Sequence, residues 1–402
     1  MVTFEDVKDA YNVLKDVAKH TPLDRSKTFS ELTKAQVYLK LENLQKTGSF
    51  KIRGAYNKIY HLKNEEKKRG VVCASAGNHA QGVAYASNLM RISSTVFMPI
   101  YTPPTKIIAT KAYGAHVVLE GVTYDDALLG ARKYAEEKRL TYVHAFNDSY
   151  IIAGNGTIGM EIYEDLPDVD VVVVPIGGGG LISGIALALK TLKPDVEIIG
   201  VEAEGAQSMK QSLKENKIIP LKSVLTIADG IAVKTPGNLT FQLAKKYVDK
   251  VVTVNDEEIS HALYLLLQRS KLVVEPAGAV GVAALLSKKI YYPRKNIVAL
   301  VSGGNANLSL LMQIIERGML KDKLLVKISV VVLDRPKVLK DILAILANFG
   351  ANVQSITHDR CTTSVPVGHV KLTIMFQTLG KEQIEAIKNE FDKNNLKYHI
   401  LS

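Results

Sequence analysis

Short apolar runs alternate with stretches of helical periodicity along most of the chain, and this alternation predicts its fold class. From about residue 70, apolar runs at 70–73 and 94–99 lead through turns into helical patterns at 75–87 and 104–113. Residues 169–175 contain four consecutive valines, as expected of a strand that is buried on both faces. Repeated strand–helix order is typical of parallel sheets with helices packed outside them. We therefore expect an α/β protein.

The same pattern continues to about residue 318. Residues 197–202, 250–254 and 296–302 are further strand candidates with helical stretches between them. Because a parallel sheet needs several such strands, the region 1–318 is predicted to form one α/β body that contains two sheets.

The pattern changes after the charged stretch 316–323 and predicts a second unit. Residues 319–324 are expected to be a linker, and a compact unit is expected at 325–402. Its apolar patterns follow the order strand, helix, strand, strand, helix, strand, which is the split βαβ arrangement. The predicted strands are 326–333, 352–358, 369–378 and 396–401, and the predicted helices are 336–349 and 381–393.

Composition limits the classes of partner and compartment. Lys and Arg number 51 against 40 Asp and Glu, a formal charge of +11, but the basic residues are scattered in mixed-sign runs such as 64–69. Such runs are typical of solvated helix faces, so nucleic-acid binding is not expected, whereas an anionic substrate or cofactor would explain part of the balance. Cys73 and Cys361 predict no disulfide, which fits a reducing cytoplasm. The first residues lack a signal-peptide pattern, and no apolar stretch approaches about 20 residues, so no membrane span is expected.

Four successive glycines mark the first candidate binding site. Gly177, Gly178, Gly179 and Gly180 join the predicted buried strand to a helix. Backbone N–H groups can converge there on one oxyanion, and the helix dipole favours its negative charge. A tight turn without a ligand is the alternative, but a turn does not require four glycines. We therefore expect a phosphate group at this loop.

Three further segments carry groups suited to chemistry, although each alone also has a structural explanation. Lys51 stands near the start of an amphipathic helix, where desolvation can hold an amine neutral and nucleophilic; an ordinary surface lysine is the alternative. Residues 75–80 follow a strand and open a helix, which suits either a carboxylate-binding turn or a capped helix start. Residues 301–305 end the last strand of the body with a hydroxyl beside flexible backbone.

Residues 154–159 match the glycine spacing of the dinucleotide-binding fingerprint. That motif requires a preceding strand and an acidic residue about 20 positions later, at the end of the next strand. Here the next strong strand ends at Pro175 and the glycine cluster, without a carboxylate in place. A nicotinamide cofactor is therefore not expected.

Taken together, these segments resemble the fold-type II pyridoxal-phosphate family and, within it, the threonine dehydratases. The motifs that carry the resemblance are 48–55 (GSFKIRGA), 75–79 (SAGNH), 177–180 (GGGG), 227–230 (IADG), 275–278 (EPAG) and 302–305 (SGGN). The resemblance covers nearly the whole chain. It implies a body of two parallel-sheet α/β subdomains, a large one from 1–60 and 149–318 and a small one from about 61–148.

The resemblance implies the cofactor pyridoxal 5′-phosphate and a set of residues around it. Lys51 would bind the cofactor covalently and take the Cα proton of the substrate. Asn78 would contact the ring hydroxyl, Ser302 would face the pyridine nitrogen, and Asn147 is similar to a ring-contacting position of related racemases. The cofactor set is Lys51, Asn78, Asn147, Gly177, Gly178, Gly179, Gly180, Leu181 and Ser302. The substrate set, in which the turn at 75–79 binds the carboxylate, is Ser75, Ala76, Gly77, His79, Gly230 and Glu275.

The implied reaction removes water from L-threonine, and more slowly from L-serine, to give a 2-oxo acid and ammonia. A neutral serine at the pyridine nitrogen draws less electron density than an aspartate, which favours loss of the β-hydroxyl over transamination. Serine racemases share the scaffold but carry a serine as second base at the position of Ala76, so negligible racemisation is implied here. Their cation site matches Glu202, Ala206 and Ser208; with serine at the third position no divalent metal is expected, and a monovalent ion stays open.

The unit at 325–402 resembles an ACT domain. Asp334-Arg335-Pro336 lies at the first strand-to-helix turn, and Asn352-Val353 opens the second strand. Such domains pair through their sheets and bind small amino acids at the interface, which implies an allosteric amino-acid effector and a homodimer or homotetramer. Lys337 replaces the usual glycine after the proline, which leaves a purely structural role open.

Other functions stay open beside the dehydratase hypothesis. One is a serine dehydratase or another β-eliminating or β-replacing enzyme of the same fold, such as a cysteine synthase. Another is a non-catalytic amino-acid sensor, against which the presence of Lys51, Asn78 and Ser302 argues. The sequence does not decide between a role in isoleucine biosynthesis and one in threonine breakdown.

Overall fold

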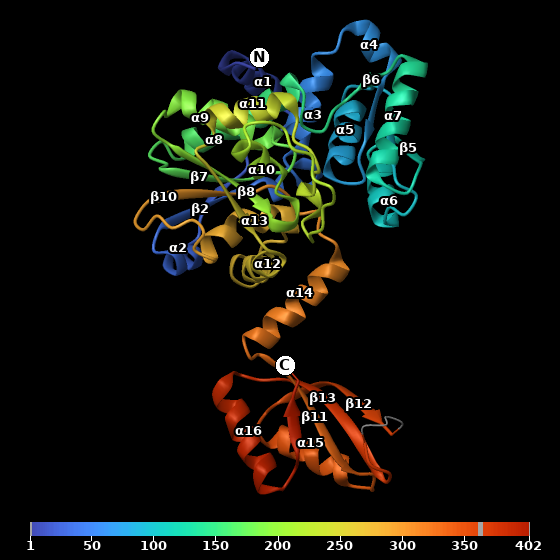
Figure 1. Cartoon of the computed structure of the whole chain (residues 1–402), viewed down its shortest axis with the longest axis vertical. Helices are drawn as coiled ribbons and strands as arrows, with labels where there is room; N and C mark the ends of the chain where they lie inside the picture. Colours follow the sequence, from blue (N-terminus) through green and yellow to red (C-terminus); the bar gives the residue numbers. More distant parts are fainter. Residues whose placement is uncertain (1, 361–364, 402) are drawn as a thin grey trace. The chain divides into compact units, whose positions relative to one another are not determined.

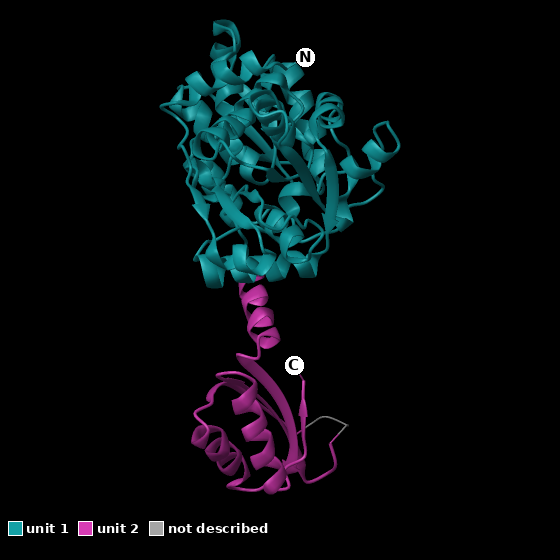
Figure 2. Ribbon diagram, turned by 90° about the vertical axis from the view of Figure 1, so that its left-hand side faces the viewer, with its two compact units in different colours: residues 1–307 teal, residues 308–402 magenta. Residues whose placement is uncertain are grey.

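The computed structural model describes residues 2–360 and 365–401. Its contacts divide the chain into two compact units, residues 1–307 and 308–402 (Figure 2). The linker expected at 319–324 overlaps the end of α14 (Leu308–Lys321), a helix that is grouped with the second unit. Cys73 is free and buried, whereas Cys361 lies outside the described residues.

A six-stranded sheet forms the centre of the first unit. Its strands are hydrogen-bonded in the order β1-β2-β10-β7-β8-β9, and every neighbouring pair is parallel except β1 with β2. These strands are β1 (Leu23–Arg25), β2 (Gln36–Leu41), β7 (Val171–Pro175), β8 (Glu197–Ala203), β9 (Lys250–Val254) and β10 (Asn296–Val301). The strands predicted from the apolar runs after residue 168 are confirmed.

A second, four-stranded sheet has the order β5-β4-β3-β6, and all its pairs are parallel. Its strands are β3 (Val71–Ala74), β4 (Ser94–Met98), β5 (His116–Leu119) and β6 (Thr141–Tyr142). The prediction of an α/β body built on two parallel sheets is thereby confirmed.

Helices cover both faces of each sheet (Figure 1). They are α1 (Phe4–Leu14), α2 (Lys27–Thr33), α3 (Lys51–Tyr60), α4 (Asn64–Arg69), α5 (Asn78–Leu89), α6 (Pro104–Ala112), α7 (Tyr124–Lys138), α8 (Ser149–Asp165), α9 (Gly180–Leu192), α10 (Ser208–Lys214), α11 (Asn238–Tyr247), α12 (Asp256–Ser270) and α13 (Pro276–Leu286). The helix expected at 75–87 begins only at Asn78, because residues 75–77 form the turn that leads into it.

Alternate side chains of the valine strand pack against different helices. Val172 and Val174 share one core with residues of α8 and α9. Val173 points to the opposite face, where a Cβ on Gly281 of α13 would lie 3.4 Å from its Cγ1. Both faces of β7 are therefore covered, which explains why the strand is apolar at every position.

The glycine-spaced segment 154–159 lies inside α8, so the prediction that it is not a dinucleotide loop is confirmed. Its glycines serve helix packing instead. A Cβ on Gly154 would lie 2.5 Å from the carbonyl oxygen of Arg53, and one on Gly159 would lie 3.0 Å from Ala188. Without side chains at these positions, α8 approaches both α3 and α9 closely.

A buried ionic cluster holds the start of α3. Arg53, two residues after Lys51, lies 2.7 Å from Glu42 and 2.5 Å from Glu161, and Lys40 lies 2.8 Å from Glu161. Buried charges of this kind are tolerated only when each finds its partners. The cluster therefore ties the end of β2, the first turn of α3 and α8 together at one point.

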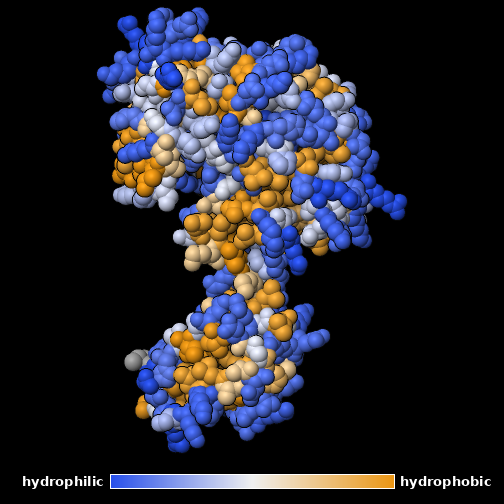
Figure 3. Space-filling model, turned by 180° about the vertical axis from the view of Figure 1, so that it is seen from behind, coloured by the Kyte–Doolittle hydropathy of each residue, from blue (hydrophilic) through white to orange (hydrophobic). Residues whose placement is uncertain are grey.

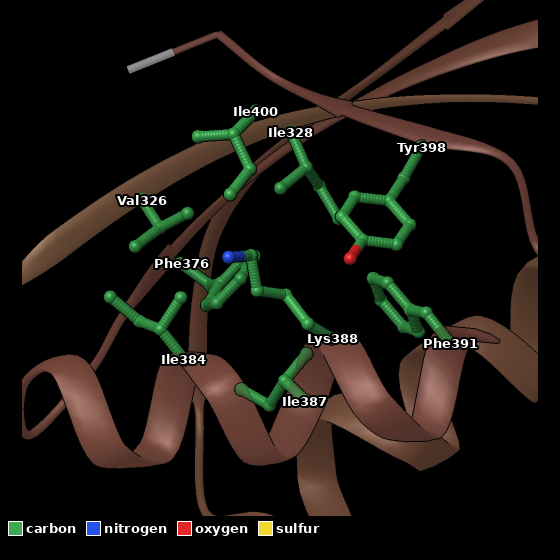
Figure 4. Close-up of a pocket in the computed structure, with 9 residues that line it drawn as sticks. All are labelled: Val326, Ile328, Phe376, Ile384, Ile387, Lys388, Phe391, Tyr398 and Ile400. Carbon is green, nitrogen blue, oxygen red and sulfur yellow. The ribbon is translucent and has the colours of Figure 1, made fainter. Parts of the chain in front are cut away.

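The second unit contains a four-stranded antiparallel sheet in the order β12-β13-β11-β14. Its elements are β11 (Leu325–Leu333), α15 (Val338–Asn348), β12 (Asn352–Asp359), β13 (His369–Gln377), α16 (Lys381–Lys393) and β14 (Tyr398–Ile400). The predicted order of strands and helices is confirmed. Figure 4 shows how side chains of the sheet and of α16 meet; they are Val326, Ile328, Phe376, Ile384, Ile387, Lys388, Phe391, Tyr398 and Ile400.

Hydrophilic residues cover much of the surface of both units, with apolar patches between them (Figure 3). Within residues 2–360 and 365–401, every helix is too short or too polar to cross a membrane.

Candidate active site

Three of the predicted turns follow the carboxyl ends of parallel strands. The glycine cluster follows β7, residues 302–305 follow β10, and residues 75–77 follow β3. In open parallel sheets, ligands bind in the crevice outside these strand ends. Phe50, which precedes Lys51 and the first turn of α3, is hydrogen-bonded to the turn that follows β10.

Lys51 is the first residue of α3, and its amine lies in a desolvated environment. Its Nζ donates a hydrogen bond to the carbonyl oxygen of Ala145 across 3.3 Å and lies 4.9 Å from the centre of the Phe50 ring. Desolvation lowers the pKa of this amine to about 8, and the nearby charge of Glu275 opposes the shift. At pH 7 about a tenth of Lys51 is therefore neutral, the form in which an amine is a nucleophile and a base.

Asn78 and Glu275 form a hydrogen-bonded pair near Lys51, in which Glu275 is buried and Asn78 is partly buried. Asn78 begins α5, Glu275 caps α13, and Asn78 Nδ2 donates to Glu275 Oε1 across 2.7 Å. Burial raises the pKa of Glu275 to about 7, while the hydrogen bond from Asn78 lowers it. The backbone of Gly303 passes so close that a Cβ there would lie 2.4 Å from Glu275 Oε1. This explains the need for glycine beside the pair.

The glycine cluster forms a tight loop at the start of α9. Gly179 has φ of +91°, a conformation that favours glycine, and a Cβ on Gly178 would lie 2.4 Å from the ring of Phe146. Thr240 Oγ1 donates to the carbonyl oxygen of Gly178 across 2.7 Å. This bond fixes the loop through its carbonyl side and does not involve its N–H groups. Leu181 follows in the first turn of the helix and is buried. Such N–H groups at a helix N-terminus bind anions well.

The other predicted residues lie around these groups. Ser302 is buried, and its carbonyl oxygen accepts a hydrogen bond from the Phe50 N–H at 3.2 Å. A Cβ on Gly230 would lie 3.7 Å from Glu275 Oε1. Asn147 Oδ1 accepts from the Leu239 N–H at 3.0 Å, so this side chain holds the first turn of α11.

The turn at 75–79 offers backbone groups to a ligand, whereas the imidazole of His79 is already hydrogen-bonded within the chain. Ser75 Oγ accepts from the Gly77 N–H at 3.2 Å, and Ala76 is partly buried. His79 Nε2 donates to the carbonyl oxygen of Val143 at 3.0 Å, and burial lowers the pKa of the ring to about 3. His79 is therefore a neutral side chain engaged with the backbone.

The segment 144–146 was not singled out in the sequence. It supplies the carbonyl oxygen that accepts from Lys51 and the Phe146 ring that lies against Gly178. His144 Nδ1 accepts from the N–H groups of Phe146 and Asn147 and so shapes the turn; burial lowers the pKa of its ring to about 4. These contacts join residues far apart in the chain, which is why no local pattern indicated them.

Comparison with known proteins identifies the family. Residues 14–303 match the model of the pyridoxal-phosphate dependent enzymes. The chain belongs to this family. An L-threonine ammonia-lyase of Thermotoga maritima is 50% identical over 388 residues, which cover 96% of this chain and 96% of the relative.

Solved structures of the pyridoxal-phosphate enzymes align with most of the chain. Threonine deaminase isoform 2 from Solanum lycopersicum, in its processed form, aligns with a TM-score of 0.75 at 40% identity, covering 79% of this chain and 88% of that one. Maize serine racemase aligns with a TM-score of 0.75 at 35% identity, covering 80% and 98%.

The site fits pyridoxal phosphate on its own geometry. The amine of Lys51 has a lowered pKa, as attack on an aldehyde requires, and the glycine loop leaves a cradle at a helix N-terminus for a phosphate. Asn78 supplies an amide and Glu275 a carboxyl group near the lysine. The aldehyde of pyridoxal phosphate is thus matched by the lysine, its phosphate by the glycine loop, and its polar ring by the amide and the carboxyl group.

Glu202 lies at the position matched to the cation site of the racemases. It is fully buried, and its two carboxylate oxygens accept from the N–H groups of Met209 and Lys210, each at 2.8 Å. Burial raises the pKa of this carboxyl to about 7. The first turn of α10 thus supplies its partners.

Proposed function

We propose that this chain is an L-threonine ammonia-lyase that converts L-threonine to 2-oxobutanoate and ammonia with pyridoxal 5′-phosphate, and that it accepts L-serine as a secondary substrate. The observation that carries the proposal is that segment 144–146 contacts both Lys51 and the glycine loop, while the Asn78–Glu275 pair lies near the same lysine. Similarity over 96% of the chain to the L-threonine ammonia-lyase of Thermotoga maritima supports the choice of substrate.

Each residue then has a defined role toward the cofactor. Lys51 holds it covalently, and the N–H groups of Gly177, Gly178, Gly179, Gly180 and Leu181 hold its phosphate. Asn78 and Ser302 contact the ring, and Asn147 supports the ring side of the site through the first turn of α11, to which it is hydrogen-bonded. These roles agree with the positions of the side chains around the first turn of α3.

The chemistry requires one proton to be removed from an unreactive carbon. Pyridoxal phosphate, when bound, withdraws electrons from the substrate Cα and makes its proton acidic. The substrate amine would take the place of Lys51 at the cofactor, so that the freed Lys51 Nζ can accept this proton while the β-hydroxyl leaves with a proton as water. The pKa of about 8 suits a base that works near neutral pH. The imidazole of His79 is hydrogen-bonded to Val143, so it does not bind the substrate carboxylate. The backbone of Ser75, Ala76 and Gly77 orients this carboxylate instead.

Glu275 and Gly230 line the substrate side of the site. A carboxyl with a pKa of about 7 changes its charge near neutral pH. The absence of a side chain on Gly230 leaves room beside Glu275, where a Cβ would approach Ala277 to 3.0 Å. We propose that this room accommodates the β-substituent of the substrate.

Racemisation is the alternative suggested by the maize structure. It requires a group that protonates the second face of the Cα. Ala76 offers only a methyl group in the turn before α5, so negligible racemisation is expected. L-serine lacks one methyl group of L-threonine, and a fitted pocket discriminates between them by about 1–3 kcal/mol.

We also propose that the second unit is an ACT-like module that pairs with its copy in a cytoplasmic homodimer or homotetramer and binds an amino-acid effector. Its antiparallel sheet and its order of elements support this. Lys337 stands where ACT domains usually have glycine, and its φ of +83° is a conformation that favours glycine. At this position the turn has a backbone conformation that suits glycine, although the residue is a lysine.

The decisive experiment measures 2-oxo acid release by the purified protein with pyridoxal phosphate from L-threonine and from L-serine. Faster 2-oxobutanoate release, lost in Lys51→Ala, is the expected result. Pyruvate from L-serine alone would favour a serine dehydratase. No oxo acid from either, with product formed from L-serine and sulfide, would favour a β-replacing enzyme. Binding of the amino acid without any turnover would indicate a sensor.

A further inference from the structure

Two segments far apart in sequence run side by side next to Lys51. The Phe50 N–H donates to the carbonyl oxygen of Ser302 at 3.2 Å, and the Gly304 N–H donates to that of Gly48 at 2.9 Å. Ser49 and Gly303 form an isolated antiparallel bridge between these two bonds. The turn that carries the lysine is therefore held against the turn after β10.

Asn305 stands at the end of this ladder and extends it to α5. Its Nδ2 donates to the carbonyl oxygen of Thr47 and to Oδ1 of Asn78, each at 2.8 Å. Asn78 Nδ2 in turn donates to Glu275 Oε1 at 2.7 Å. A continuous chain of hydrogen bonds thus runs from Thr47 through two side-chain amides to Glu275.

The direction of this chain is set by its first member. A backbone carbonyl can only accept, so the group of Asn305 that faces Thr47 must be its NH2. The same NH2 faces Asn78, so Asn78 must present its oxygen there. Its own NH2 is then left to face Glu275 and the ring side of the site. The orientation of Asn78 follows from Thr47 through Asn305.

The backbone of residues 47–48 packs closely against the side-chain amide of Asn305 and restricts its movement. A Cβ on Gly48 would lie 2.7 Å from Asn305 Oδ1, and Gly48 has φ of +70°. Thr47 has φ of +62°, an uncommon conformation for a threonine, and it aims its carbonyl at Asn305. The space for the Asn305 side chain is therefore small and polar on one side.

We infer that Asn305 is a positioning residue that fixes the amide of Asn78 with its NH2 toward Glu275 and the cofactor ring. The inference rests on the proposed function for the identity of the cofactor. Asn305 itself acts through Asn78, and no role in binding the substrate is assigned to it. Reversal of the Asn78 amide would present an acceptor to Glu275 in place of a donor.

Asn305→Asp tests this polarity, because a carboxylate has the shape of the amide but cannot donate. Both Thr47 and Asn78 would then face an acceptor, so the Asn78 amide is expected to reverse. The cofactor-free chain should bind pyridoxal phosphate about tenfold more weakly, because the partly buried amide of Asn78 then presents the wrong atom to Glu275 and the cofactor ring. The midpoint of the pH titration of the bound cofactor's absorbance should also move.

Asn305→Ala separates polarity from packing. It removes the donor without adding a charge, so it should weaken binding less than Asn305→Asp does and shift the titration in the same direction. Asn64→Asp, at an exposed position at the start of α4, makes the same chemical change away from the site and should leave both measurements unaltered.

Three results would overturn the inference. The first is an Asn305→Asp protein with wild-type affinity and titration. The second is an Asn305→Ala protein that binds as weakly as Asn305→Asp or more weakly, because loss of shape would then explain the effect. If Asn305→Asp does not fold, an unchanged titration in Asn305→Ala is the third. Failure of the wild type to turn over threonine or serine would refute the proposed function separately, since these ratios concern cofactor binding alone.

Discussion

Asn78 donates a hydrogen bond from Nδ2 to Glu275 Oε1 across 2.7 Å, and this contact joins the first turn of α5 to the first turn of α13. It is the main polar contact of a carboxyl group that is otherwise desolvated. Burial raises the pKa of Glu275 from 4.5 to about 7 in the folded chain. The folded state therefore keeps its proton at pH values where the unfolded chain has released it.

Glu275→Gln should consequently change the pH dependence of stability. Between pH 4.5 and about 7, the unfolded wild-type chain binds fewer protons at this position than the folded one, so stability falls as pH rises. The variant lacks this loss and should gain up to about 3 kcal/mol over wild type across that range. Denaturant unfolding of the cofactor-free chain at pH 5 and pH 8 measures the difference. The exposed Glu215→Gln should show no such gain.

Lys51 should bind the cofactor at a rate that depends on pH. Only the neutral amine attacks an aldehyde, and desolvation lowers the pKa of this amine to about 8. The rate of recombination of the cofactor-free chain with pyridoxal phosphate should rise about tenfold per pH unit below 8 and level off above it. Stopped-flow absorbance gives the profile. A midpoint near 10.5, the usual value for lysine, would show that the amine is solvated.

Gly178→Ala should impair cofactor binding by displacing the Phe146 ring, from which the new Cβ would lie 2.4 Å away. Overpacking of this kind costs about 1–3 kcal/mol, so affinity for pyridoxal phosphate should fall about fivefold to a hundredfold. Gly281→Ala is the matched control, because its Cβ would meet ordinary contacts from 3.4 Å outward. Equal affinities for the two variants in a fluorescence titration would contradict the role of the loop.

Lys337→Gly should stabilise the second unit. Lys337 has φ of +83°, a region in which a Cβ is strained and glycine is not. The substitution should raise the free energy of unfolding of this unit by about 1 kcal/mol. Hydrogen exchange of the β11 and β13 amides in the full chain reports it. Lys337→Ala keeps the Cβ and should give no gain; if both variants behave alike, the charge of the lysine and not its backbone is responsible.

Local patterns predicted the elements well because each depends on neighbours in the chain. The four valines of β7 alternate between two helical layers, and that burial on both faces is what their uninterrupted apolar run indicated. The order of elements in the second unit likewise followed from apolar periodicity. The helix predicted from residue 75 begins at Asn78 because a turn with polar contacts precedes it, and periodicity does not register such turns.

The chemistry-bearing groups were also visible in the sequence, since a lysine at a helix start and four glycines after a buried strand are unusual locally. The effect of the surrounding residues on their pKa values and hydrogen bonds was not visible in the sequence. The lowered pKa of Lys51 comes from desolvation, and its hydrogen-bond partner Ala145 lies far along the chain.

The sequence by itself thus determined the order of the strands and helices in both units, because periodicity and turn composition act over a few positions. Only the tertiary structure decided that Phe146 lies against the glycine loop, that Asn305 orients Asn78, and that Glu275 is desolvated. These are contacts between distant segments, and their energies depend on distance and burial, which a linear pattern does not contain.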